Sequence, residues 1–325
     1  MTIATDFATR RPEVDIKQLR AFLAIADTGS ITRASETLHL VQPALSRQLR
    51  MLEDELGTTL FERTPRGMDL TDAGARLIDR ARRALREIDG ARTEILAASP
   101  GAVRGTVELG LLTSHSEMIA APLVAALRAS HPDLLLRIFT SYSDRLREWL
   151  ESGDVGLAML TDYKQSSQLD MQPLFAEQLC LVGGPALEDH GREPIGLQRL
   201  VSLPLILPTF YRGLRLILDH ASEAQGVKLN VVAETNDTRV QKEMLQLNLG
   251  YAVLPINIVA AEAASGQLKF TPLASEELQR RTGIAVSMMR RNSLAVRAVA
   301  NELNALTRTL IQEGRWVGAT WIGED

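Results

Sequence analysis

The first third of the chain carries apolar residues at the spacing of an amphipathic α-helix. The first predicted stripe, with i, i+3, i+4 and i+7 spacing, consists of Leu19, Phe22, Leu23 and Ala26. Gly29 is expected to end this helix, and Ser30 is a favourable N-cap for the next one. The second helix is short, with an apolar face of Ile31, Ala34 and Leu38.

A third helix is predicted after a tight turn over residues 39–41. Pro43 falls in its first turn, where proline is tolerated, and its apolar face consists of Leu45, Leu49, Leu52 and Leu56. Two short helices joined by a tight turn, with a supporting helix before them, are typical of a helix-turn-helix. The third helix would then enter the major groove of DNA, and the side chains free to contact bases and phosphates would be Gln42, Ser46, Arg47 and Arg50.

Residues 60–71 contain two short apolar segments around a Pro-Arg-Gly turn, which predicts a β-hairpin. Arg63 and Arg66 lie at its tip, so the hairpin would suit a wing that grips the DNA backbone or the minor groove.

Charge alone does not identify the ligand of this region. The net charge of the chain is −4, and acidic and basic residues are equally numerous in the first 100 residues. Their placement is more informative, because Glu53, Asp54 and Glu55 lie at the far end of the third helix from its arginines. Each arginine taken singly is also consistent with an ordinary solvated charge, and each leucine stripe with a plain core.

A longer motif distinguishes these interpretations. Its main parts are Gly29-Ser30-Ile31-Thr32-Arg33-Ala34-Ser35, Gln42-Pro43-Ala44-Leu45-Ser46-Arg47-Gln48, Leu60-Phe61-Glu62-Arg63 and Leu70-Thr71-Asp72-Ala73-Gly74. Through these segments the chain resembles the LysR-type transcriptional regulators of bacteria nearly residue for residue. The resemblance implies a winged helix-turn-helix over residues 15–72 that binds double-stranded promoter or operator DNA. The DNA-binding residues that it implies are Ser30, Arg33, Gln42, Pro43, Ser46, Arg47, Arg50, Arg63 and Arg66.

Residues 71–97 have the pattern of one long helix with Thr71 as its N-cap. Apolar positions in steps of four and three form a thin seam of Leu77, Ala81, Ala84, Ile88, Ala91 and Ile95. Such a seam cannot stabilise an isolated helix in water, so it must pack on its own chain or on a second copy. The resemblance favours a dimerisation helix and hinge over residues 73–100, in a homodimer or homotetramer.

From Val103 onward, short apolar strands alternate with amphipathic helices, which predicts an α/β fold with mainly parallel sheets. The predicted strands are residues 106–111, 134–139, 155–160, 205–207, 229–233 and 251–254. The predicted helices are residues 117–130, 143–152, 237–247 and 256–264, with a further helix that begins at Gly213.

This part resembles the effector domain of LysR-type regulators, whose two lobes are similar in shape to periplasmic solute-binding proteins. The resemblance implies an effector domain over residues 101–312. Lobe one would be residues 103–162 and 270–312, and lobe two residues 163–269, with crossovers near Tyr163 and Lys269. Residues 1–14 are expected to be a flexible tail. A C-terminal tail over residues 313–325 would pack on lobe one or on a neighbouring molecule.

Ligands of open α/β sheets bind at the carboxyl ends of the strands. Hydroxyl groups and amides at a helix N-terminus can hold an anion there, so we expect a small-molecule effector, with a carboxylate that pairs with Arg212 or with the helix near Ser114. A serine or threonine at such a junction is also consistent with a plain N-cap. The candidate effector-binding residues are Thr113, Ser114, His115, Ser143, Thr161, Pro208, Thr209, Arg212 and Asn236.

The segment over residues 205–215 most resembles the branch of LysR-type regulators that controls nitrogen assimilation. Phe210, Tyr211 and Arg212 depart from that branch, which often has a polar pair before the glycine. A bulkier rim of this kind would accept a different ligand.

An enzyme with a DNA-binding appendage is the main alternative. Ser114, His115 and Ser116 could supply a nucleophile, but sequence neighbours cannot form a catalytic triad by themselves. The chain has no Gly-x-Ser-x-Gly elbow, Walker loop, His-Glu-x-x-His motif or cysteine metal set. We therefore expect no enzymatic activity, no cofactor and no metal. A secreted solute receptor is the second alternative, and the N-terminal third argues against it.

Residues 1–13 lack the apolar core of a signal peptide, and no apolar run approaches the roughly 20 residues of a membrane span. Cys180 is the only cysteine, which excludes an internal disulfide and fits a reducing compartment. These features predict a cytoplasmic bacterial protein without a membrane partner. Its expected partners are DNA, an effector and other copies of itself, with RNA polymerase as a further candidate.

Overall fold

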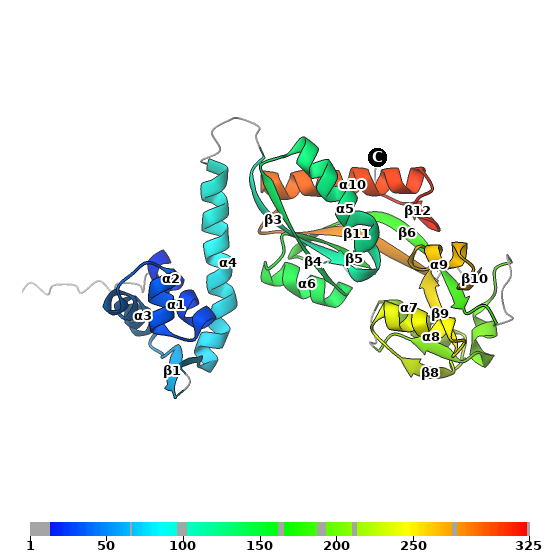
Figure 1. Cartoon of the computed structure of the whole chain (residues 1–325), viewed down its shortest axis with the longest axis horizontal. Coiled ribbons are helices and arrows are strands. Elements are labelled where there is room, and N and C mark those ends of the chain that lie inside the picture. Colours follow the sequence, from blue (N-terminus) through cyan, green and yellow to red (C-terminus); the bar gives the residue numbers. More distant parts are fainter. Residues whose placement is uncertain are drawn as a thin grey trace, which may run out of the picture. The chain divides into compact units, whose positions relative to one another are not determined.

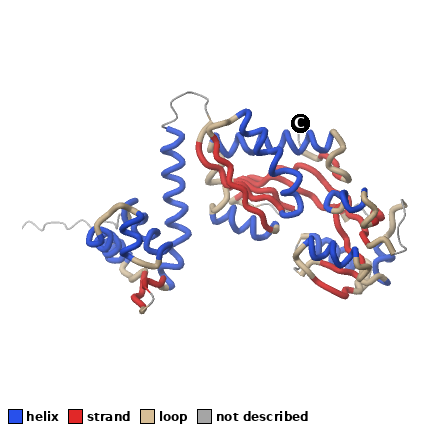
Figure 2. Tube along the Cα trace, viewed as in Figure 1, coloured by secondary structure: helices blue, strands red, loops and turns tan. Residues whose placement is uncertain are grey.

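The computed structural model describes residues 14–65, 67–95, 103–161, 166–186, 193–209, 213–274 and 278–323. The chain divides into two compact units, Met1–Leu96 and Ala97–Asp325, which are described separately below (Figure 1). The first unit is mainly helical, whereas the second combines helices with an extensive sheet (Figure 2). In the described ranges, no helix is long and apolar enough to cross a membrane.

The first unit contains every element that the sequence predicts for it. In chain order these are α1 (Ile16–Thr28), α2 (Ile31–Thr37), α3 (Gln42–Leu56), β1 (Phe61–Thr64), β2 (Gly67–Leu70) and α4 (Asp72–Ile95). Asp15 caps α1 through a capping box with Gln18, and Gly29 ends it in the left-handed conformation at φ 63°. The Ser30 hydroxyl accepts the backbone N–H of Arg33 and caps α2, as expected.

The three short helices share one core with the hairpin and with α4. Phe22 of α1 and Phe61 of β1 lie 5.4 Å apart between ring centroids, and Leu45 and Leu52 of α3 are fully buried beside them. Leu56 was predicted on the same face as Leu52, but it is 40% exposed because it is the last residue of α3. Therefore α3 packs on the core through the apolar residues of its first three turns, and its last residue does not contribute.

The β1–β2 hairpin is fixed against the α1–α2 corner by its backbone. The Met68 N–H donates to the Gly29 carbonyl at 2.9 Å. A Cβ atom on Gly67, whose φ is 136°, would lie 2.3 Å from that same carbonyl oxygen. Only glycine allows this close approach, which sets the position of the hairpin relative to α3.

The seam predicted along α4 is divided between two environments. The Thr71 hydroxyl accepts the Gly74 N–H at 3.1 Å, so Thr71 caps the helix as predicted. Ala81 is buried in the core of the first unit, and Leu77 and Ala84 pack against that core. The remaining seam positions are exposed, namely Ile88, Ala91 and Ile95. The part of the seam over residues 77–84 thus packs on its own chain, and only the second part is available to another copy.

The second unit contains a ten-stranded mixed sheet. Its strands are β3 (Gly105–Leu112), β4 (Leu134–Ser141), β5 (Leu157–Thr161), β6 (Leu169–Gly183), β7 (Leu205–Leu207), β8 (Val231–Glu234), β9 (Tyr251–Pro255), β10 (Lys269–Pro272), β11 (Gln279–Ser287) and β12 (Ala319–Trp321). The order is β4-β3-β5-β11-β6-β9-β7-β8, and β10 and β12 also pair with β6. Pairs among β3, β4 and β5 and among β7, β8 and β9 are parallel, whereas those of β6 with its neighbours are antiparallel.

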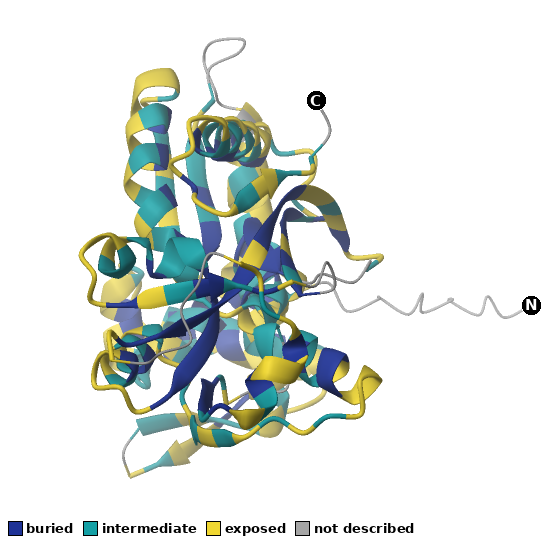
Figure 3. Cartoon of the chain, turned by 90° about the vertical axis from the view of Figure 1, so that its right-hand side faces the viewer, coloured by how far each residue is buried: buried dark blue, intermediate teal, exposed yellow. Residues whose placement is uncertain are grey.

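Helices cover both faces of this sheet. Their bounds are α5 (Thr113–Ser130), α6 (Ser143–Ser152), η1 (Leu197–Ser202), α7 (Leu214–Ala224), α8 (Thr238–Gln246), η2 (Ile256–Ile258), α9 (Ala260–Ala264) and α10 (Leu294–Gln312). In the first lobe, α5 and α10 lie side by side on one face, and α6 covers the other face (Figure 1). Buried residues gather in the central strands of the sheet, such as β5, β6 and β9, as Figure 3 shows.

The central strands of the second lobe are apolar on both faces. Leu181 and Val253 belong to the core under α7, whereas their neighbours Val182 and Ala252 belong to the core under α8 and α9. Side chains alternate between the faces of a strand, so a continuous apolar run is the pattern of a strand buried on both sides. This is the reason that residues 205–207 and 251–254 were recognisable as strands.

The long strand β6 carries the chain between the two lobes. Its residue Gln178 still pairs with Gln279 of lobe one, whereas Leu179 pairs with Pro255 of lobe two. The return runs between Pro272 of β10 and Gln279 of β11. The crossovers were predicted near Tyr163 and Lys269. Tyr163 lies outside the described residues, and Lys269 pairs with Gly183 of β6, so the two boundaries stay predictions.

The C-terminal residues complete lobe one. Trp316 is 1% exposed and belongs to the core of that lobe, and β12 pairs with Phe175–Glu177 of β6. Of the two placements left open by the sequence, the tail takes the one on its own chain.

Candidate functional sites

A groove in the first unit joins α3 to the hairpin. It has a volume of about 450 Å³, and five of the residues predicted to bind DNA line it, namely Gln42, Pro43, Ser46, Arg50 and Arg63. Arg47 is exposed on the same helix and has no ion-pair partner among the residues that the structure describes. Arg66 lies outside those residues. The helix and the hairpin thus present their polar side chains along one concave surface.

Three of the predicted DNA-binding residues also have local structural partners, and one of these is Arg50, whose Nε donates to the Ser46 carbonyl at 3.4 Å. The Arg33 guanidinium donates to the Thr28 carbonyl near the end of α1, and the Ser30 hydroxyl is occupied by the N-cap bond. Glu53 accepts the Leu60 N–H at 2.7 Å and links α3 to the start of the hairpin. These contacts position α3, whereas Gln42, Arg47 and Arg63 remain exposed.

The N-terminus of α3 has no side-chain cap. Its N-cap is Val41, whose side chain makes no capping hydrogen bond, and Pro43 removes one backbone donor from the first turn. The Ala44 N–H donates to the Val41 carbonyl at 2.9 Å, so the Gln42 N–H is the donor of that turn left at the positive end of the helix dipole. An anion such as a DNA phosphate would be stabilised there.

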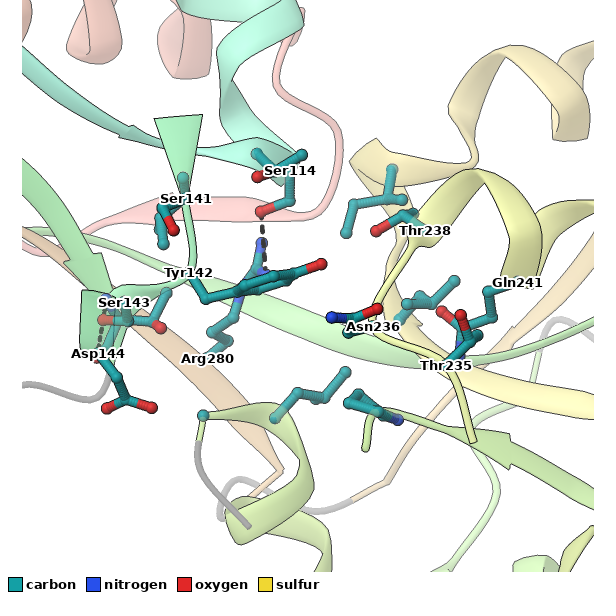
Figure 4. Close-up of a pocket in the computed structure, with 18 residues that line it drawn as sticks. Ser114, Ser141, Tyr142, Ser143, Asp144, Thr235, Asn236, Thr238, Gln241 and Arg280 are labelled. Atoms are coloured by element: carbon teal, nitrogen blue, oxygen red, sulfur yellow. Dashed lines mark hydrogen bonds between the residues drawn. The ribbon is translucent and has the colours of Figure 1, made fainter. Parts of the chain in front are cut away.

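The second unit has a pocket between its two lobes (Figure 4). Lobe one supplies strand ends and the starts of α5 and α6, and lobe two supplies the starts of α7 and α8. The polar lining residues are Thr113, Ser114, Ser141, Tyr142, Ser143, Asp144, Thr161, Thr235, Asn236, Thr238, Gln241 and Arg280. The cavity volume is about 130 Å³, below the roughly 300–1,000 Å³ of common ligand sites, so the pocket as it stands fits a small ligand.

Six of the nine predicted effector residues line this pocket: Thr113, Ser114, Ser143, Thr161, Pro208 and Asn236. One of them is already engaged in the fold. The Ser143 hydroxyl donates to the Thr161 carbonyl at 3.1 Å and accepts the Thr161 N–H at 3.0 Å. It ties the start of α6 to the end of β5, so its oxygen has less capacity for a ligand than that of Ser114.

The other three predictions fare differently. Thr209 is exposed and does not line the pocket, and Arg212 lies outside the described residues. His115 was predicted as a direct contact, but its side chain is fully buried in lobe one and does not reach the pocket. The cause is an earlier start of α5 than predicted, at Thr113, which turns His115 toward the sheet.

Arg280 is the one cation that lines the pocket among the described residues. It extends from β11, and its Nη1 donates to the Ser114 hydroxyl at 3.3 Å (Figure 4). Its Nε donates to Glu177 at 2.8 Å, and its Nη2 lies 2.7 Å from the same carboxylate oxygen. Nη2 also lies 2.8 Å from Nε2 of His115. The guanidinium is therefore held on three sides, with Nη1 toward the pocket.

Glu177 is the buried counter-charge of this cation. Its other carboxylate oxygen accepts the indole N–H of Trp316 at 3.0 Å. Burial raises the pKa of Glu177, but Arg280, then His115 and the hydrogen bonds from His115 and Trp316 lower it, and the result is a pKa of about 2. Burial lowers the pKa of His115, although Glu177 opposes this. Glu177 is thus ionised and His115 neutral at pH 7.

Four helices begin at this pocket, and three of them lack a side-chain cap. The N-caps of α5, α6 and α7 are Leu112, Tyr142 and Gly213, none of which makes a side-chain capping bond. By contrast, Asp237 caps α8 by accepting the N–H groups of Arg239 and Val240. The uncapped first turns leave backbone donors and positive dipole ends around the cavity. Together with Arg280 they favour a ligand that carries negative charge.

A second, larger cavity of about 780 Å³ adjoins the first on the outside. It shares Thr113, Ser114 and Tyr142 with the inner pocket and adds charged residues such as Glu117 and Lys242. Tyr142 lines both cavities, and its ring extends toward Asn236 and Thr238 of lobe two (Figure 4). Burial raises the pKa of Tyr142, and Asp237 adds to this rise. Its phenol is neutral at pH 7 and can donate a hydrogen bond.

Arg280, Glu177 and Tyr142 were not predicted from the sequence. Arg280 and Glu177 are separated by 103 residues, and only the antiparallel register of β11 and β6 places them opposite one another. A signal was nevertheless present, because Glu177 is the one acid within the apolar run from Leu174 to Val182. A charge in such a run is almost never buried without a partner.

Two domain models of known families match the chain. The "LysR substrate binding domain" matches residues 100–308, and the "Bacterial regulatory helix-turn-helix protein, lysR family" matches residues 16–75. The HTH-type transcriptional regulator BbuR of Bordetella bronchiseptica is 29% identical over 97% of the chain and 97% of its own length. The nitrogen assimilation regulatory protein nac of Escherichia coli is 30% identical over 74% of the chain and 78% of its own length.

Solved structures support the fold of both units. Full-length OxyR from Pseudomonas aeruginosa has a TM-score of 0.70 with 22% identity, covering 90% of the chain and 98% of that protein. Full-length CbnR in complex with its target DNA has a TM-score of 0.66 with 19% identity, covering 90% and 99%. The predicted combination of a helix-turn-helix unit with a C-terminal α/β unit is confirmed.

Proposed function

Because the chain belongs to the LysR family of bacterial transcriptional regulators, we propose that α3 and the hairpin read operator DNA while the pocket of the second unit binds a small anionic effector. The observation that carries this proposal is the shared design of the two sites. The groove has one helix N-terminus without a side-chain cap and the pocket has three, and each site has at least one arginine. Both ligands would therefore be anions.

In the DNA-binding role, Gln42, Ser46 and Arg47 contact base edges from the first turns of α3. Arg50 and Arg63 contact phosphates from the two walls of the groove. Pro43 fixes the first turn, and Ser30 and Arg33 act mainly by holding α2 and the end of α1. Arg66, which lies outside the described residues, is a further candidate.

In the effector-binding role, Arg280 and Ser114 bind the anionic group. Thr113, Thr161 and Asn236 supply further hydrogen bonds, and Ser143 and Pro208 shape the wall. A small carboxylate fits the cavity volume and the donor-rich lining. Binding would draw the lobes together along β6 and β11 and so change how copies of the chain pair on DNA.

The same scheme requires more than one copy of the chain, and the exposed positions Ile88, Ala91 and Ile95 on α4 are the proposed contact between copies. We further propose that the protein acts in the bacterial cytoplasm on DNA, with RNA polymerase as a candidate partner, and has no catalytic activity. In support of the last point, burial raises the pKa of the Cys180 thiol to about 12, which keeps it protonated and unreactive. The similarity to nac supports membership of the nitrogen-assimilation branch.

A mobility-shift assay on the DNA that flanks the gene tests the DNA-binding role. At fixed salt, Arg47→Ala should weaken specific binding by about 1–3 kcal/mol, since a bidentate arginine–base contact contributes that much. Arg239→Ala is the matched control, because Arg239 is 84% exposed but lies on α8 of the second unit. Equal affinities of the two variants would exclude Arg47 from the interface.

A further inference from the structure

The last described residues of the chain lie outside the part that matches the substrate-binding domain, which ends at residue 308. They nevertheless run beside the ligand pocket's most buried charges. The three residues of β12 pair with the β6 segment that ends at Glu177, and Trp316 is buried against Phe175 with ring centroids 4.5 Å apart. This C-terminal segment, residues 314–323, therefore contacts the strand from which Glu177 projects.

One carboxylate connects the segment to the pocket. Oε1 of Glu177 accepts the Trp316 indole N–H at 3.0 Å, and Oε2 accepts Arg280 Nε at 2.8 Å. Arg280 in turn reaches the pocket and donates to Ser114. Its Nε and Nη2 are both directed at Glu177, and Nη1 is the nitrogen that reaches the pocket. Trp316 thus fixes the carboxylate that fixes the guanidinium.

The hydrogen-bonded series from Trp316 through Glu177 to Arg280 lies where the strands pass from one lobe to the other. Glu177 lies directly opposite Arg280 in the pairing of β6 with β11, and two residues later β6 pairs with lobe two. Any rotation of the carboxylate would change the direction of Arg280 at the point where the chain passes between lobes.

We propose that the C-terminal segment is a working part of the ligand site, in which Trp316 and Glu177 are positioning residues that aim Arg280 at an anionic ligand. The proposal rests on the proposed role of Arg280 in effector binding. It makes docking of the segment and binding of the ligand mutually favourable, because each stabilises the same orientation of the guanidinium.

Trp316→Phe is the direct test, since phenylalanine keeps an aromatic ring beside Phe175 and His115 but removes the N–H donor. Trp321→Phe is the matched control: it is the same substitution in the same segment, and the Trp321 indole nitrogen has no hydrogen-bond partner among the described residues. Binding of acetate, succinate and inorganic phosphate to the full chain is measured by calorimetry. Trp316→Phe should weaken it about five- to tenfold, a modest coupling between sites, and Trp321→Phe less than about twofold.

A second measurement needs no ligand. In protein labelled with ¹⁵N-arginine, the Nε–H of Arg280 is assigned with Arg280→Lys and should be strongly protected from exchange in the wild type. Trp316→Phe should reduce that protection, and Trp321→Phe should not. Equal behaviour of the two tryptophan variants in both measurements would overturn the positioning role.

The two proposals fail in different ways. If none of the three anions binds the wild type, or if Arg280→Lys binds them as well as the wild type does, the anion site is wrong, while the Arg280 Nε–H still decides the role of Trp316. If Trp316→Phe does not fold, wild-type protein labelled with 5-fluorotryptophan replaces it. Succinate or phosphate should then shift the Trp316 ¹⁹F signal more than those of Trp149 and Trp321, and an unshifted Trp316 signal overturns the coupling.

Discussion

Arg47 of the first unit and Arg280 of the second, two of the arginines that we propose to bind anions, lie in opposite environments. Arg47 is exposed on α3 and has no ion-pair partner among the described residues. Arg280 is buried against Glu177 and His115 and exposes little of its side chain to the pocket. The stability of the fold therefore does not depend on the charge of Arg47, whereas the charge of Arg280 must be neutralised by Glu177 even without a ligand.

The difference teaches how each site can be recognised and altered. A site of exposed side chains on one helix can change without loss of stability, because each side chain is solvated in the free protein. A site built on a buried ion pair cannot, because removal of one charge leaves the other without a partner in a low-dielectric interior. Substitutions at the two arginines should therefore separate function from stability in one unit and couple them in the other.

The largest expected effect is that of Arg280→Met. It leaves the Glu177 carboxylate buried without its cation, so the second unit should lose about 3–5 kcal/mol of stability. All three tryptophans, Trp149, Trp316 and Trp321, lie in that unit, so urea unfolding followed by tryptophan fluorescence reports on it alone. Arg47→Met should leave the midpoint of the mainly helical first unit unchanged, which far-UV circular dichroism follows because that unit has no tryptophan. A similar loss of stability in both variants would contradict the contrast between the two arginines.

Acid should destabilise the second unit through the same cluster. The pKa of Glu177 is lowered from its ordinary value of 4.5 to about 2, so its contribution is present above pH 4.5 and is lost as the pH falls toward 2. That shift corresponds to roughly 3 kcal/mol. The pKa of His115 is also lowered, from 6.5, so a further loss begins as the pH falls below 6.5. His115→Gln should abolish the loss nearer neutral pH and keep the one below pH 4.5, as read by urea midpoints across pH.

Substitution of one serine in each unit tests the same contrast between the units with smaller expected changes in stability. Ser143→Ala removes both hydrogen bonds with the Thr161 backbone, so the second unit should lose about 1–2 kcal/mol. Ser46→Ala in the first unit should change stability by less than about 0.5 kcal/mol while it weakens specific DNA binding. Thermal unfolding of each variant, together with a mobility shift, checks both expectations. Loss of stability in Ser46→Ala would show that Ser46 also contributes to the folding of the first unit.

The smallest effect on folding is expected from Ile95→Ser at the end of α4. Ile95 is 82% exposed, so the substitution should alter the stability of the chain by less than about 0.5 kcal/mol. It should nevertheless raise the dissociation constant between copies, as measured by sedimentation at several protein concentrations. Ala81→Ser should lower the stability of the first unit and leave the dissociation constant between copies unchanged, because Ala81 lies in the core of that unit. An unchanged dissociation constant in Ile95→Ser would exclude this part of α4 from the interface.

The polar side chains that α3 exposes could be predicted from the sequence nearly completely, and the lining of the pocket only in part. Gln42, Ser46, Arg47 and Arg50 lie on one short helix, so helical periodicity alone places them on one face. The pocket draws on four helix starts, and periodicity locates each start without fixing which side chain faces the cavity. The error at His115 arose in this way: α5 begins four residues earlier than its apolar pattern indicates, at Thr113 rather than Glu117.

The helix-turn-helix, the hairpin, the long helix and the strand–helix alternation all follow from local sequence pattern, because each depends on neighbours within one or two turns of chain. Local pattern does not reveal that Ala81 packs inward, that Trp316 belongs to the core of lobe one, or that Glu177 neutralises Arg280. The physical reason is that a buried charge and its partner are selected by strand register and solvent exclusion. These are properties of the assembled sheet, and no local segment contains them.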